Sequence, residues 1–109
     1  MKVKPLLKAL RNVAKFSNPY STIPQFRYVE ISTRSGCTFL KTQSETGGME
    51  EFVEEDIEIN ETFYMHPQLL IQLLRSFTSS TDIKFSIEGE ALKWETDNTR
   101  GKLLRANLN

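Results

Sequence analysis

The sequence predicts an α+β domain in which two helices pack on antiparallel sheets. Two segments carry apolar residues at helical spacing, and each is followed by short alternating segments that are typical of strands. The two halves also repeat this order, which indicates an internal helix-plus-three-strand duplication. Because 109 residues make one ordinary domain, we expect a single domain over residues 1–109.

The first predicted helix covers residues 4–15. Pro5 suits the first turn of a helix, where its missing N–H group costs nothing. One face is apolar, and it consists of Leu6, Leu7, Leu10, Val13 and Ala14. The opposite face is polar and carries Lys4, Lys8, Arg11, Asn12 and Lys15. Two prolines and several turn-forming residues end the helix within residues 17–24.

Three strands are predicted after this helix. Residues 28–33 and 37–42 form a hairpin, and Gly36 supplies the positive φ that its tight turn needs. An acidic third strand covers residues 49–59 and continues into residues 62–65. Its apolar residues do not alternate cleanly, which favours a bulge.

The second half begins with a helix at residues 66–77, with Pro67 near its start. Its predicted apolar stripe consists of Leu69, Leu70, Leu73, Leu74 and Phe77. The predicted polar face carries Gln68, Gln72 and Arg75, with Ile71 as an odd member. Strands follow at residues 83–87, 91–96 and 102–108, the first two joined at Gly89.

The charge is zero overall but unevenly distributed. Residues 1–27 hold six basic residues and no acid, whereas residues 28–66 hold nine acids and two basic residues. An exposed helix face is often lysine-rich for solubility alone, but such a face usually includes acids as i,i+4 partners. The first helix has none, so we interpret its polar face as a surface for a polyanion.

Several kinds of function find no support in the sequence. We expect no enzyme, no cofactor and no metal site: Cys37 and His66 have no orienting third group, and residues 50–58 lack the spacing of a calcium loop. We interpret Trp94 as a core residue. A single cysteine excludes an internal disulfide and fits a reducing compartment. We see neither a signal peptide nor a membrane span, and so expect a cytoplasmic protein.

The chain resembles one domain of the bacterial DNA polymerase III β subunit, the sliding clamp. The resemblance is carried by "LLKALRNVAKF", "STIPQFRYVEI" and the long segment "FYMHPQLLIQLLRSFTSSTDIKFSIEGEALKWETDNTRGKLLRAN". Two positions depart from the family pattern: Thr42–Ser44 stand where the family has Ala-Thr-Asp, and Gln25 follows Pro24 where an apolar residue is usual.

This resemblance implies a DNA-clamp-like fold and a role as a processivity factor in DNA replication. In the family, about six such domains join edge to edge into a closed ring, with helices lining the hole through which DNA passes. The implied partners are duplex DNA, further copies of the chain bound through sheet edges, and a DNA polymerase. The implied DNA-facing residues are Lys4, Lys8, Arg11, Lys15 and Arg75. We expect exposed sheet edges near residues 49–59 and 102–108.

A second interpretation stays open. A lone clamp-like domain could bind a partner, such as a host clamp or another replication protein, through an exposed sheet edge and without contact to DNA. The sequence does not decide between these interpretations, nor does it show whether the chain is a whole protein or a fragment.

Overall fold

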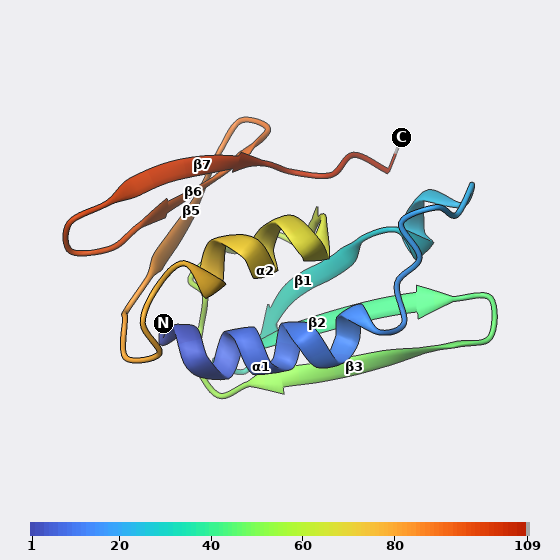
Figure 1. Cartoon of the computed structure of the whole chain (residues 1–109), viewed down its shortest axis with the longest axis horizontal. Coiled ribbons are helices and arrows are strands. Elements are labelled where there is room, and N and C mark those ends of the chain that lie inside the picture. Colours follow the sequence, from blue (N-terminus) through green and yellow to red (C-terminus); the bar gives the residue numbers. More distant parts are fainter. Residues whose placement is uncertain (109) are drawn as a thin grey trace.

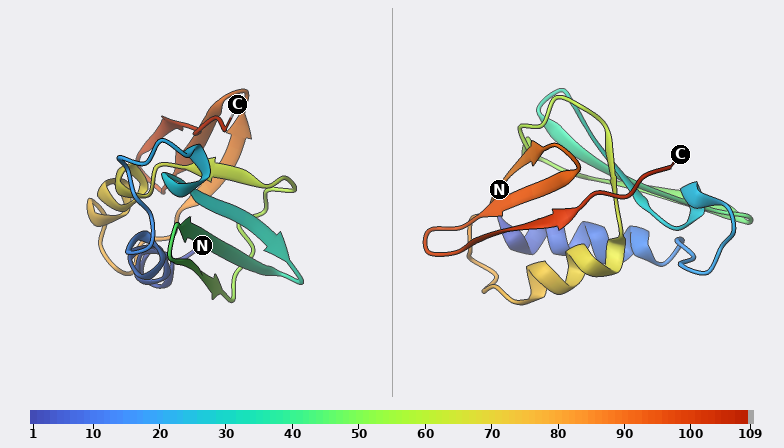
Figure 2. Two further views of the ribbon diagram at one scale, coloured as in Figure 1. Left: turned by 90° about the vertical axis from the view of Figure 1, so that its right-hand side faces the viewer. Right: turned by 90° about the horizontal axis from the view of Figure 1, so that it is seen from above.

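A computed structural model describes residues 1–108, in which two helices lie side by side on one side of two antiparallel sheets (Figures 1 and 2). The first half contains α1 (Val3–Ala14), a short 3-10 helix η1 (Pro24–Phe26), β1 (Val29–Arg34), β2 (Cys37–Ser44) and β3 (Gly47–Val53). The second half contains β4 (Phe63–Met65), α2 (Pro67–Arg75), β5 (Lys84–Glu88), β6 (Ala91–Glu95) and β7 (Arg100–Leu104). The predicted fold class and the duplication are confirmed.

The strands form two sheets with the orders β3-β2-β1-β4 and β5-β6-β7. The segment before each helix pairs with the other half of the chain. β4 precedes α2 but pairs with β1, and Lys2, just before α1, forms an isolated bridge with Asp82, just before β5. The buried side chains of the two halves also form one shared core.

The first hairpin turns as predicted. Arg34 and Cys37 lie opposite each other, so Ser35 and Gly36 alone make the turn. Both have positive φ angles, 53° and 78°, which match the twist of the flanking strands.

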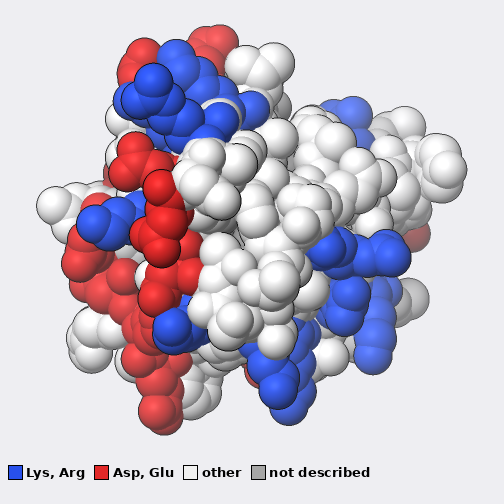
Figure 3. Space-filling view, turned by 60° about the vertical axis from the view of Figure 1, so that its left-hand side comes forward, with Lys and Arg blue, Asp and Glu red and all other residues white. Residues whose placement is uncertain are grey.

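Charged side chains are segregated on the molecular surface. In the view of Figure 3, Asp and Glu form a band on the left, while Lys and Arg gather at the lower right and at the top. Uncharged atoms lie between these areas. The uneven distribution of charge along the sequence therefore corresponds to an uneven distribution of charge on the molecular surface.

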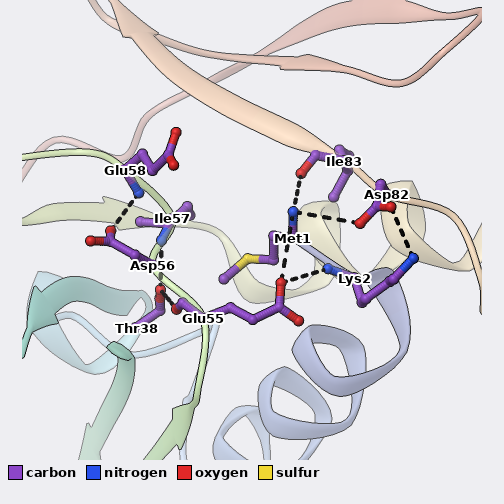
Figure 4. Close-up of polar contacts among 9 residues, drawn as sticks. All are labelled: Met1, Lys2, Thr38, Glu55, Asp56, Ile57, Glu58, Asp82 and Ile83. Carbon is purple, nitrogen blue, oxygen red and sulfur yellow. Dashed lines mark hydrogen bonds and ion pairs between the residues drawn. The ribbon is translucent and has the colours of Figure 1, made fainter. Parts of the chain in front are cut away.

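The predicted third strand was wrong in its length. β3 ends at Val53, and residues 54–62 lie outside any strand, although Ile57 and Ile59 are buried. Thr38 determines this path (Figure 4): its hydroxyl donates to the Glu55 carbonyl at 2.7 Å and accepts the Ile57 N–H at 2.9 Å. The chain leaves the sheet because these bonds replace those of a strand ladder.

We expect Thr38→Val to loosen this segment and to lower the free energy of unfolding by about 1–3 kcal/mol, because a buried N–H and a carbonyl lose their partner. Denaturant unfolding followed by fluorescence of Trp94 measures the change. Thr22→Val is the matched control, since Thr22 is exposed. Equal stability of both variants would show that Thr38 does not hold the segment.

The buried faces of the helices differ partly from prediction. α2 buries Pro67, Leu70, Ile71 and Leu74, whereas Leu69 is 44% exposed. Apolar residues occur on two overlapping stripes of this helix, and packing against α1 and the sheets selects the stripe that includes Ile71. Asn12 was wrongly placed on the polar face of α1. It is half-buried, and its amide donates to Glu51 on β3 at 2.8 Å.

One further strand prediction, that of the last strand, needs adjustment. β7 begins at Arg100 and ends at Leu104, so residues 105–108 continue without strand structure. The 3-10 helix η1 was not predicted. Trp94 is half-buried and meets Phe77 edge-on, with ring centroids 5.5 Å apart, which confirms its interpretation as a core residue.

Candidate nucleic-acid interface

α1 presents its basic residues to solvent in one line. Lys4, Lys8 and Arg11 are exposed on the helix, and Lys15 follows as its exposed C-cap. Their spacing of four, three and four residues keeps them on one side, because about 3.6 residues complete a helical turn. We call these four residues the basic stripe. The opposite side of α1 faces the core through Val3, Leu6, Ala9, Leu10 and Val13.

The basic stripe has opposing effects on the stability of α1. Like charges four residues apart destabilise a helix by about 0.2–0.5 kcal/mol for each pair, and two such pairs occur, Lys4 with Lys8 and Arg11 with Lys15. Lys4 also lies in the first turn, where the helix dipole favours acids, and that turn contains none. Arg11 in the last turn and Lys15 at the C-cap lie where the dipole favours positive charge, by about 0.3–1 kcal/mol each. These opposing contributions are of similar size, so the stripe brings the helix little net stabilisation.

Within residues 1–108, no member of the stripe takes part in an ion pair. Some basic residues elsewhere do form ion pairs. Lys93 and Lys102 contact Glu88 at 3.0 and 3.1 Å, and their hydrogen bonds lower the pKa of that carboxyl group below its ordinary value. Other basic residues in the described range, such as Lys41 and Lys84, are also outside these ion pairs. What distinguishes the stripe is that four such residues lie in one line on a single helix.

The packing of the two helices brings Arg75 close to the stripe. Arg75 is the last residue of α2 and is exposed. A shallow groove of about 450 Å³ lies between the helices, with an apolar floor and a basic rim. It is lined by Val3, Lys4, Leu7, Lys8, Arg11, Asn12, Arg75, Phe77 and Ser79. Four of the five predicted DNA-facing residues therefore surround one groove, and Lys15 lies apart from it at the end of α1.

The rest of α2 contributes little positive charge. Its exposed residues before Arg75 are Gln68, Leu69 and Gln72, which are all uncharged. The helical side of the molecule is therefore basic along α1 and nearly neutral along α2.

The acidic residues lie mostly away from the stripe. Glu50 is exposed on β3 and pairs with Arg34 at 3.2 Å, while the adjacent Glu51 turns to the other face and reaches α1 through Asn12. Glu51 is therefore an exception to the predicted separation of charges.

Two further residues considered in the sequence are Cys37 and His66. Cys37 is half-buried beside the first hairpin turn, and His66 meets the ring of Tyr28 edge-on at 4.8 Å. Residues 1–108 contain no cluster of three or more His, Cys, Asp and Glu side chains that could hold a metal ion. In the same range, neither helix has the length and apolarity needed to cross a membrane.

Comparison with known proteins gives structural matches only. No protein-family model matches the chain, and no curated protein matches it. Among solved structures, the DNA polymerase III β sliding clamp of Bartonella birtlesii matches with a TM-score of 0.85 at 21% identity, over 97% of this chain and 28% of the clamp. The β subunit of Pseudomonas aeruginosa matches with a TM-score of 0.84 at 17% identity, over 96% and 29%. The β clamp of Helicobacter pylori matches at 12% identity, with a TM-score of 0.82 over 96% and 29%.

The chain spans less than a third of each of these clamps. The prediction of a non-enzymatic protein is in keeping with these matches, because the matched proteins are sliding clamps. At such low identity, the likeness describes the fold. The chain has the fold of one domain of a bacterial DNA polymerase III β sliding clamp.

Proposed function

We propose that this chain is a sliding-clamp module that encircles duplex DNA without sequence preference and serves as a processivity factor for a DNA polymerase. The observation that carries the proposal is the uncompensated basic stripe on the helical side of a clamp-domain fold. The proposal takes residues 1–109 as a single domain and Lys4, Lys8, Arg11, Lys15 and Arg75 as its DNA-facing residues.

The stripe suits loose contact with a DNA backbone. From Lys4 to Lys15 it extends about 16 Å along the helix axis, since each residue adds about 1.5 Å. Lys and Arg side chains can follow phosphates over this length without reading base edges, so they add affinity but no sequence preference. A net charge of zero for the whole chain limits non-specific attraction elsewhere on the protein.

Encirclement by this chain alone requires several copies, because one domain cannot surround a duplex. β3 and β7 are edge strands of their sheets, as predicted from residues 49–59 and 102–108. Joining β3 of one copy to β7 of the next would be a head-to-tail contact, and such contacts form a ring when the rotation closes.

The side chains at the two edges complement each other. The outer face of β3 carries Glu50 and an exposed Phe52, while that of β7 carries Arg100, Lys102 and an exposed Leu104. Pairing the edges would place opposite charges and two apolar side chains, 55% and 72% exposed in the single chain, next to each other.

Light scattering over a concentration series tests this association. We expect a mass that rises to a closed oligomer of several chains and then stays constant. The double variant Phe52→Lys and Leu104→Lys should remain monomeric, because it removes the apolar pair and adds charge to both edges. A wild-type chain that stays strictly monomeric at high concentration would contradict self-assembly into a ring.

The same exposed edges favour a second candidate function. The chain could bind a partner protein, such as another clamp, by adding an edge strand to its sheet and without contacting DNA. Binding of plain duplex DNA at low salt distinguishes the two candidates: the clamp module binds, and the interaction protein does not.

A further inference from the structure

Tyr20 is unusually exposed for an aromatic residue. Its exposed fraction is 91%, whereas Phe16 and Ile23 in the same loop are 39% and 37% exposed. An aromatic side chain that stays in water gives up the stabilisation that its burial would bring. Residues 15–23 join α1 to η1.

The loop around Tyr20 is held by hydrogen bonds. Asn18 donates its N–H to the Phe26 carbonyl at 2.7 Å, and its side-chain oxygen accepts the Tyr20 N–H at 3.0 Å. Ser21 donates its N–H to the Asn18 carbonyl at 3.1 Å, and its hydroxyl accepts the Ile23 N–H at 3.1 Å. The backbone on both sides of Tyr20 is thus fixed, and it presents the side chain at low entropic cost.

This loop lies on the helical side of the molecule. Seen from above in Figure 2, it extends past the end of α1 on the side of the two helices, away from the sheets. The loop begins with Lys15 of the basic stripe, and residues 1–27 contain no acid. The exposed ring of Tyr20 thus follows the last residue of the stripe by five positions in the chain.

We propose that Tyr20 stacks on an unpaired base of single-stranded DNA whose phosphates contact Lys15 and the adjoining part of the basic stripe. A nucleic acid strand is the ligand that combines an anionic backbone with flat rings. The base is unpaired because the bases of a duplex are already stacked on both faces. Phe16 and Ile23 add apolar surface next to the stacked base. This inference rests on the proposed function, since both use the same basic helix.

Fluorescence anisotropy of the full chain with a labelled thymidine oligonucleotide, and with a duplex of the same length, tests the inference. Tyr20→Ala is expected to weaken single-strand binding about tenfold, within the range measured for aromatic–base stacking, and to change duplex binding by less than about twofold. Tyr20→Phe keeps the ring and should bind like the wild type. Leu69→Ala, an exposed apolar residue on α2, is the matched control and should change neither affinity.

The outcomes separate this inference from the proposed function. Unchanged single-strand binding by Tyr20→Ala, or an equal loss with duplex, would overturn the stacking role while leaving the clamp proposal in place. Single-strand binding that depends on Tyr20, in a chain that does not bind duplex, would support stacking and overturn the proposed function.

Discussion

Replacing Lys8, Arg11 and Lys15 together by glutamate is expected to weaken binding to duplex DNA by about a hundredfold or more at moderate salt. Each of these residues is exposed and free of ion pairs within the described residues, so each is available to a phosphate. The salt dependence should fall as well. The slope of log K against log salt should become shallower by about 0.9 for each phosphate contact that is lost, or about 2.7 for three.

A matched control variant distinguishes the effect of where these charges lie from the effect of the change in net charge. Lys41→Glu, Lys84→Glu and Lys93→Glu change the net charge equally, but these residues lie on strands and outside the proposed β3 and β7 contact edges. We expect this control variant to keep most of the wild-type affinity and its salt slope. If the stripe variant binds DNA with an unchanged slope, the basic stripe is not the DNA-facing surface.

Truncating Leu10 to alanine is expected to lower the free energy of unfolding by about 2–5 kcal/mol. Leu10 is fully buried on α1, so its removal leaves a cavity beneath the helix that carries the basic stripe. For a domain of this size the total stability is about 5–15 kcal/mol, so the loss is a large share of it. Urea unfolding gives the change from the shift in midpoint.

Leu104→Ala provides the comparison, because the same side chain is 72% exposed on β7. Its effect on the unfolding of the monomer should stay within about 0.5 kcal/mol. Similar losses for both variants would mean that Leu10 does not lie in the core, and the placement of α1 would then be wrong.

Local patterns predicted the helices and the hairpins well. Helical spacing in the two leucine-rich segments located α1 and α2, and Gly36 and Gly89 marked two hairpin turns that the structure confirms with positive φ angles. These features depend on neighbours in the chain, so the sequence shows them directly.

The failures depend on contacts between distant residues. β3 ends where Thr38, on another strand, holds residues 55–57. Ile71 is buried and Leu69 is exposed because of the elements that pack against α2. The periodicity of a single helix does not indicate what those elements are. β4 pairs with the opposite half of the chain, and no local pattern indicates such an exchange.

Only part of the candidate site could be predicted, because only part of it depends on neighbouring residues in the chain. The basic stripe is a local pattern on one helix, whereas the groove that joins it to Arg75 depends on the packing of α1 against α2. The sequence did not single out Tyr20, because a turn-rich segment lacks the helical or strand periodicity that indicates which side chains are exposed. The one signal in the sequence was an aromatic residue between two prolines, in a stretch without acids.

Retention on DNA circles tests the central claim most directly. The wild-type chain is mixed with a closed circular plasmid and separated from free protein by gel filtration, before and after the plasmid is cut once. A ring that encloses the duplex should elute with the circle and be released when the DNA becomes linear. Equal retention on circular and linear DNA, or no retention on either, would contradict encirclement by this chain.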